Sequence, residues 1–170
     1  TRYRFGGEIE PETGADQNSV FFVGIGGAPY SYVWRWNLDR VEDTNGNVAS
    51  YFYAVELNSY KSNSYVRAGE LSRIEYTKRS DQIVQPHARV LFNRELRCLD
   101  PTSTTGCDEN ADFYDAPQDL TCLGTCAQTA PVFWTDYRLD SVQPQVYDPS
   151  SGRWRTSAYY DLTYTPLSIQ

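Results

Sequence analysis

Several residue types are scarce in this chain of 170 residues, and each scarcity excludes a class of function. Methionine is absent, histidine occurs once, and two lysines stand against thirteen arginines. A single histidine cannot build a multi-histidine metal site, and any histidine-based triad would depend on His87. Because His87 has no nucleophile motif beside it, we expect a surface or structurally satisfied histidine and a chain that is not an enzyme.

Long apolar segments and an excess of positive charge are also missing. No apolar run approaches the roughly 18 residues of a membrane span, so we expect no membrane insertion. The net charge is −7 and the isoelectric point is near 4.7, which argues against nucleic acid as a partner. The chain also has no initiator methionine, signal peptide or targeting tail, and we expect it to be a piece of a larger or processed polypeptide.

No cofactor motif is complete in the sequence. The glycines of 24–27 are followed by Ala28 and Pro29 and then by a strand pattern, whereas a dinucleotide fingerprint requires a helix there. Residues 43–47, DTNGN, begin like a calcium loop, but Gly46 comes too early for the spacing of that loop. We therefore expect no cofactor and no metal.

What the chain does contain is a high proportion of strand-forming residues. Aromatic residues make up 15% of it, with 14 tyrosines and 4 tryptophans, and 11 glycines and 9 prolines mark turns. Alternating apolar residues recur in short segments, and no long amphipathic helix is evident. The pattern predicts an all-β fold of consecutive antiparallel hairpins, arranged as a curved sheet or as a β-sandwich.

The clearest hairpin signal lies in residues 34–57, WRWNLDRVEDTNGNVASYFYAVEL. Asn45-Gly46 is a strong signal for a two-residue type I′ turn, in which both central residues have positive φ. That turn would pair residues whose numbers sum to 91 and would place the apolar side chains on one face. The expected pairs are Trp34 with Leu57, Trp36 with Val55, and Leu38 with Tyr53.

Three regions follow each other along the chain. Residues 1–96 predict successive hairpins, with a polar connection at 57–69 between two of the strands. Residues 97–130 contain all four cysteines with much Asp, Thr and Pro, and predict an irregular insert with one helical turn near 117–122. Residues 131–170 predict a C-terminal hairpin with its turn at 148–152.

The four cysteines predict disulfides and an oxidising compartment. Cys98, Cys107, Cys122 and Cys126 form an even set in an acidic, lysine-poor chain, and three pairings are possible. We favour Cys98–Cys107 with Cys122–Cys126, because both close short loops. The alternative is a four-thiolate zinc site, but neither CLDPTSTTGC nor CLGTC has the usual spacing of a zinc knuckle.

Ordered motifs in the chain resemble a known family. WRWNLDRVEDTNGNVASYFY (34–53), VRAGELSRIEY (66–76), the cysteine-containing insert and PVFWTDYRLDSVQPQV (131–146) occur in that order. This order is similar to a region of large secreted bacterial Rhs/YD-repeat proteins, on the N-terminal side of their main repeat array. The resemblance implies a hollow β-shell that carries a toxic C-terminal domain. This segment would be a non-catalytic part of the shell, or a domain docked on it, secreted or at the cell surface. Its partners would be other strands or domains of the same polypeptide.

Exposed aromatic residues on a sheet are the basis of the main alternative, a carbohydrate-binding β-sandwich module of a secreted protein. Trp134, Trp154 and Tyr159 are the candidates for stacking on a glycan. Aromatic residues also dominate β-protein cores, so a core or wall position is favoured for all three. A glycosidase would need two carboxylates beside such aromatics, and no pair stands in a recognisable context among the 22 acidic residues.

Overall fold

The computed structural model describes residues 1–25, 31–82, 85–97 and 116–164. The described part is all-β, as predicted, and contains ten strands and one short 3-10 turn. The strands are β1 (Arg2–Phe5), β2 (Val20–Gly24), β3 (Ser31–Trp36), β4 (Leu38–Glu42), β5 (Asn47–Tyr60), β6 (Asn63–Arg79), β7 (Ala88–Leu96), β8 (Tyr137–Asp148), β9 (Arg153–Thr156) and β10 (Tyr160–Asp161), and the turn η1 (Gln118–Leu120) precedes β8.

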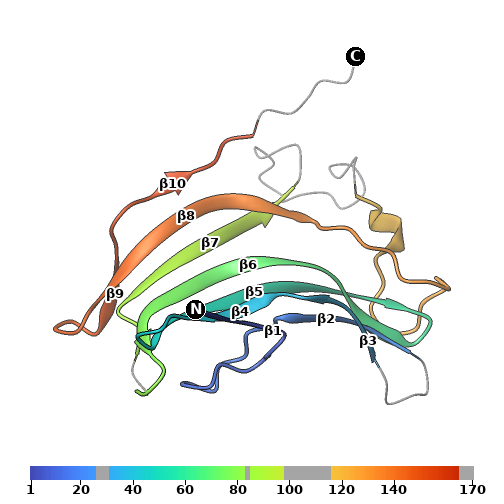
Figure 1. Ribbon diagram of the computed structural model, residues 1–170. Coiled ribbons are helices and arrows are strands. Elements are labelled where there is room, and N and C mark those ends of the chain that lie inside the picture. Colours follow the sequence, from blue (N-terminus) through green and yellow to red (C-terminus); the bar gives the residue numbers. More distant parts are fainter. Residues whose placement is uncertain (26–30, 83–84, 98–115, 165–170) are drawn as a thin grey trace.

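All ten strands belong to one antiparallel sheet. The main path runs β1-β4-β5-β6-β7-β8-β10, with β2 paired to β3 and β6, and β9 paired to β8. Figure 1 shows the long strands β5 to β8 curving together as an arch. Of the two architectures that the sequence allowed, the curved sheet is therefore the one that forms.

The central element is the β5–β6 hairpin, whose strands have 14 and 17 residues. A tight turn at Lys61 and Ser62 joins them, and Lys61 has a φ of 51°. The polar connection predicted at 57–69 is wrong, because both strands continue through it. Its polar residues belong to strands, since Asn58 and Ser59 are buried beneath residues 120–124 of the insert.

The turn between β4 and β5 differs from the predicted type I′ turn. Arg40 pairs with Ser50 and Glu42 with Val48, so the register sums to 90 and not to 91. Gly46 has a φ of 78°, but Asn45 is not among the described residues with positive φ. The Gly46 N–H donates to the Asp43 carbonyl, and the Asp43 N–H to the Asn47 carbonyl. These bonds define a three-residue loop with one glycine in the left-handed region.

The strand pairing predicted for the residues before this turn, Trp34 to Leu38 with Tyr53 to Leu57, is also wrong. The chain bends at Asn37, whose backbone and side-chain N–H groups both donate to the Ser19 carbonyl. This bend divides the expected single strand into β3, which pairs with β2, and β4, which pairs with β5. Trp34 and Trp36 therefore lie beside β2, and not opposite Leu57 and Val55.

The β2–β3 hairpin packs against the β5–β6 hairpin through Phe21, which is fully buried. The Phe21 ring contacts the rings of Trp34 and Tyr53, at centroid distances of 5.5 and 6.3 Å. A Cβ at Gly69 would lie 2.5 Å from Phe21 Cζ and 2.7 Å from the Ala54 carbonyl oxygen. Only glycine at position 69 lets the ring approach this closely.

The C-terminal part of the sheet agrees with the sequence prediction. β7 and β8 pair along their lengths, from Ala88 with Val146 to Leu96 with Tyr137, so the insert forms the connection of this hairpin. The predicted turn at 148–152 joins β8 to β9, and η1 provides the expected helical turn.

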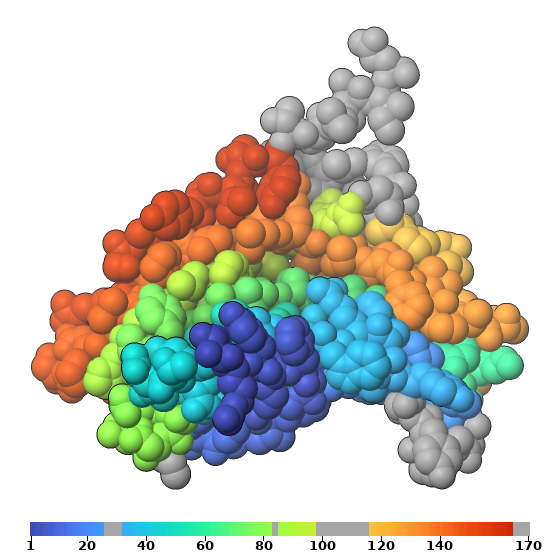
Figure 2. All heavy atoms as spheres, viewed as in Figure 1, coloured from blue at the N-terminus to red at the C-terminus, as the bar shows by residue number. Residues whose placement is uncertain are grey.

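The interior of the described part is unusually polar. Buried polar and charged side chains outnumber buried apolar ones among the described residues. Many of the buried polar groups lie where residues 6–19 cross the sheet, as in the ion pairs Lys78–Glu10 and Arg40–Glu12. Figure 2 shows this N-terminal segment, in blue, packed in front of the arch. Hydrogen bonds and ion pairs, more than apolar packing, hold this segment against the strands.

Candidate functional site

A groove of about 590 Å³ opens on the described surface. It lies where β3, β6, β7 and the segment leading into β8 meet. β2 pairs with β6 at Tyr65, β7 pairs with β6 from Arg73 onward, and residues 67–71 between these pairings border the groove. The divergence of β2 from β7 therefore opens the groove.

Two aromatic rings form an accessible wall of this groove. Trp34 and Phe133 lie 4.8 Å apart between ring centroids, and 38% and 47% of their surfaces are exposed. The Trp34 indole donates to the Val66 carbonyl at 3.0 Å, which fixes the ring against β6. The exposed part of the Trp34 ring is therefore a fixed apolar surface that faces the groove.

A buried arginine lies behind the aromatic wall. Arg67 Nη2 contacts Glu56 Oε2 at 3.0 Å and also pairs with Asp136, and the guanidinium lies 4.2 Å from the Trp134 ring centroid. Glu56 additionally accepts hydrogen bonds from the Asp136 backbone N–H at 3.0 Å and from the Thr135 hydroxyl. This network fixes the segment before β8 to β5 and β6.

Arg67 retains donors that the protein does not satisfy. Its side chain is 93% buried, yet Nε and Nη1 have no hydrogen-bond partner among the described residues. A buried unsatisfied donor costs about 1–3 kcal/mol. These donors are closed to solvent, so what the groove offers a ligand is its exposed aromatic wall, which suits a molecule with an apolar face.

Charged pairs line the side of the groove formed by β7 and β8. Arg94 pairs with Glu70, and its guanidinium lies 4.0 Å from the Tyr137 ring centroid. Arg138 Nε pairs with Glu95 at 2.7 Å. Burial raises the pKa of Glu70, and the hydrogen bond from Arg94 opposes this shift.

The structure separates the three residues proposed for sugar stacking. Trp134 borders the groove, whereas Trp154 packs on Tyr147 and under Arg89, at the far end of β8. About ten residues of extended strand, roughly 33 Å, lie between the two positions. Tyr159 is 57% exposed just before β10. The sequence pattern did not reveal Trp34, Arg67 or Phe133 as groove residues, because strands distant in sequence bring them together.

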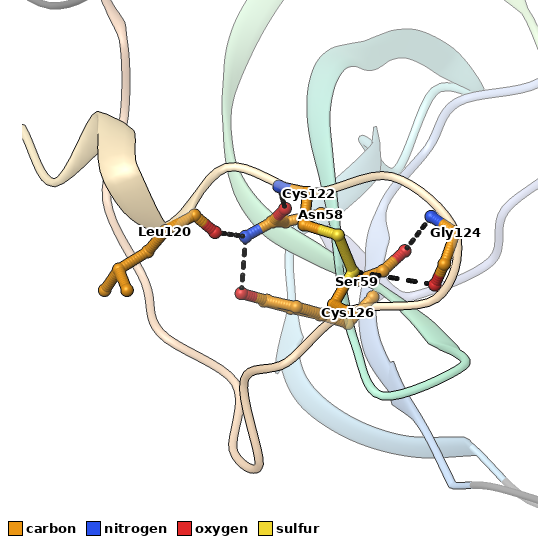
Figure 3. The surroundings of a disulfide bond; sticks show 7 residues. Asn58, Ser59, Leu120, Cys122, Gly124 and Cys126 are labelled. Carbon is orange, nitrogen blue, oxygen red and sulfur yellow. Dashed lines mark hydrogen bonds between the residues drawn. A yellow bond between two sulfur atoms is a disulfide. The ribbon is translucent and has the colours of Figure 1, made fainter.

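The insert is held to the sheet by a disulfide-closed loop (Figure 3). Cys122 and Cys126 are bonded, as the favoured pairing predicted, and Cys98 and Cys107 lie outside the described residues. Asn58, 1% exposed, accepts from the Cys122 N–H at 2.7 Å and donates to the Leu120 carbonyl at 3.0 Å. The disulfide loop therefore caps the tip of the β5–β6 hairpin.

A catalytic histidine, a metal site or a membrane-spanning helix in the described residues would indicate another class of function. His87 is exposed, as expected for a surface histidine. Within the described ranges, no group of three or more His, Cys, Asp and Glu side chains is arranged to hold a metal ion. The same ranges contain no helix of the length and hydrophobicity needed to cross a membrane.

Comparisons with known proteins found no relative. No family model matches the chain, and neither a curated protein nor a solved structure is significantly similar to it. The functional assignment therefore rests on the residues and the geometry described above, together with the resemblance of the sequence motifs.

Proposed function

We propose that this chain is a non-catalytic wall segment of a large secreted protein of the Rhs/YD-repeat type. The observation that carries the proposal is the position of exposed aromatic side chains on the outermost strands of the sheet. The ordered motifs that resemble the YD-repeat family support the same proposal. The Cys122–Cys126 disulfide fits the oxidising compartment that a secreted protein meets.

Both end strands of the main path have an open edge. Among the described strands, β1 pairs with β4 alone and β10 with β8 alone. Tyr3 and Phe5 on β1 are 62% and 59% exposed, and Tyr160 on β10 is 59% exposed. Such edges invite pairing with further strands, and isolated sheets normally protect them with charges, prolines or bulges.

In a shell, β1 and β10 would be interior strands of a longer sheet and would have no free edge. Further strands of the same polypeptide would pair with β1 and β10 and would cover the aromatic rings. The polar interior also fits a wall, because a wall is stabilised by backbone ladders and local ion pairs and needs no thick apolar core.

Thiol protection in the native polypeptide tests this proposal. Tyr3→Cys and Tyr160→Cys place thiols on the two edges, and Ser151→Cys in the exposed β8–β9 turn is the matched control. We expect the edge thiols to react with an alkylating reagent at least tenfold more slowly than the control thiol. Equal rates at all three positions would show that the edges are free and would overturn the wall assignment.

The groove supports a second candidate, carbohydrate binding. The supporting observation is the pair of exposed rings, Trp34 and Phe133, that border the groove. Sugars present hydroxyl acceptors around apolar ring faces, and aromatic side chains stack on such faces. Screening on a glycan array, followed by titration of any bound glycan, tests this function. Phe133→Ala should abolish binding and Trp154→Ala should leave it unchanged, whereas equal effects of the two variants would exclude the groove.

A further inference from the structure

A lysine and two glutamates form a buried cluster under the N-terminal segment. Lys78 at the end of β6 and Glu10 in the loop after β1 are both fully buried, and Lys78 Nζ contacts Glu10 Oε1 directly. Glu75 Oε2 lies 3.4 Å from the same nitrogen. The amine, one carboxylate and a second carboxylate are thus within reach of one another away from water.

A bulge in β6 brings Glu75 and Lys78 to the same side of the sheet. Residues three apart in a regular strand point to opposite faces. Here Ser50 pairs with Glu75 but Val48 pairs with Lys78, so β6 contains one extra residue. Thr77 absorbs it with a φ of 68°, a rare conformation for a β-branched residue. Such local strain is typical of functional positions.

The loop that carries Glu10 is fixed against the amine. The Glu10 N–H donates to the Ala15 carbonyl at 2.9 Å, and the Gly14 N–H donates to the Glu10 carbonyl at 2.8 Å. The Thr13 hydroxyl donates to Oε2, the carboxylate oxygen that does not face Lys78. These hydrogen bonds hold the Glu10 carboxyl group in place, with Oε1 toward the lysine nitrogen.

The surroundings increase the share of the amine that is uncharged and nucleophilic. Burial lowers the pKa of Lys78 from 10.5 to about 8. The buried Phe52 ring lies beside the amine, with its centroid 5.9 Å from Nζ. In such a site, transfer of the proton from the ammonium to the carboxylate gives a neutral amine and a neutral acid, which removes two buried charges.

Lysine at this position is also unusual for the chain. Thirteen of the fifteen basic residues are arginines. Arginine serves in the other buried ion pairs, such as Arg40 with Glu12 and Arg67 with Glu56. An arginine at position 78 would preserve the positive charge but would not provide an amine that can act as a nucleophile.

We propose that Lys78 and Glu10 form an intramolecular isopeptide bond, with Glu75 transferring the protons. Lys78 Nζ attacks the Glu10 carboxyl carbon, and a C–N bond forms. Glu75 accepts the proton released by the nitrogen and returns it to the departing hydroxyl group, which leaves as water. The net change is the loss of one water molecule, with no oxidation, no reduction and no other reactant.

The buried site favours the amide over its hydrolysis. A neutral amide replaces a desolvated ion pair, and the released water leaves for bulk solvent. The bond would tie the N-terminal segment covalently to β6, across 68 residues of sequence. This inference is independent of the wall assignment, because it concerns one chain and requires no further strand.

Intact-mass measurement of the folded, purified chain after reduction and alkylation tests the bond. We expect a mass lower than that of the sequence by one water molecule, and a branched peptide that joins the segments containing Glu10 and Lys78 after proteolysis. The full sequence mass, or a water loss located at other residues, would overturn the proposal.

Matched variants separate the roles of the three residues. Lys78→Arg preserves the charge and Glu75→Gln preserves both reacting groups, and we expect each variant to show the full sequence mass. Lys61→Arg, at the other lysine of the chain, should retain the water loss. Circular dichroism of Glu75→Gln shows whether it is folded. A folded Glu75→Gln that still loses water within minutes of folding would exclude Glu75 as the proton-transfer group.

Discussion

Single side chains decide where the strands of this protein turn. Asp43 accepts hydrogen bonds from the Asn45 and Asn47 backbone N–H groups at 2.8 and 2.9 Å, and from the Asn47 side chain at 2.7 Å. These bonds stabilise a loop of three residues in place of the two-residue turn that Asn45-Gly46 suggests. One carboxylate thus shifts the register of β4 against β5.

The two turn residues should differ in their contribution to stability. Gly46 has a φ of 78°, and a Cβ there would lie 3.2 Å from the Ser80 hydroxyl. We expect Gly46→Ala to lower the free energy of unfolding by about 1 kcal/mol, because alanine is strained at positive φ. Asn45→Ala is the control and should change it by less than about 0.5 kcal/mol. Equal losses in chemical denaturation would instead support a type I′ turn.

The same loop should weaken in acid. The side-chain hydrogen bond from Asn47 is the largest of the causes that lower the pKa of Asp43 below 3.8. A carboxylate with a lowered folded pKa stabilises the protein above its unfolded pKa, and this contribution disappears as the pH falls through the folded value.

Asp43→Asn should therefore unfold more easily than the wild type at about pH 6, and the difference should shrink at about pH 3. Thermal unfolding of both proteins across this range measures it. A difference between the two proteins that does not change with pH would contradict the role of the carboxylate charge.

The long β5–β6 hairpin depends on contacts with residues distant in sequence, which a local sequence pattern cannot predict. The tip of the β5–β6 hairpin extends beyond its neighbouring strands and is satisfied by the disulfide loop of the insert. The Ser59 N–H donates to the Cys122 carbonyl and the Lys61 N–H to the Gln128 carbonyl, both at 2.9 Å. The insert therefore acts as the missing neighbour of this hairpin.

Removal of the central side chain of this contact should destabilise the hairpin tip. Asn58→Ala leaves the Cys122 N–H and the Leu120 carbonyl without their partner, and we expect a loss of about 2 kcal/mol in the free energy of unfolding. Reduction of the disulfide loosens the same loop, so the two changes together should cost less than their sum. Strict additivity in denaturation experiments would show that the disulfide and Asn58 act independently.

The limits of sequence prediction in this protein follow from the same contacts. Alternation correctly predicted the strands that became β7 and β8, because each keeps a regular two-residue period over most of its length. It failed at 57–69, where the insert buries polar residues, and at Asn37, where a contact with Ser19 bends the chain. Arg67 and Phe133 were not predicted as groove residues, because they come from segments more than sixty residues apart.

At the scale of the whole molecule, the described residues form an arched sheet with a polar interior and aromatic edges. Tyr3, Phe5 and Tyr160 on the end strands β1 and β10 are 59% to 62% exposed. Tyr32 and Trp36 on β3, a strand that pairs with β2 alone, are 68% and 60% exposed, whereas Phe21 on β2 is fully buried. Burial of such rings is worth about 1.5–3 kcal/mol each, so edges of this kind are favourable only when something covers them. In our account, further strands of the same polypeptide cover them.

If this chain works as part of a larger wall, the native polypeptide that contains it must be far heavier than the chain itself. We would isolate that polypeptide under non-reducing conditions and measure its intact mass. A mass far above 19.4 kDa is the predicted result. A mass of 19.4 kDa would show that no further strands of the same polypeptide cover the edges, and carbohydrate binding in the groove bordered by Trp34 and Phe133 would then be the leading function.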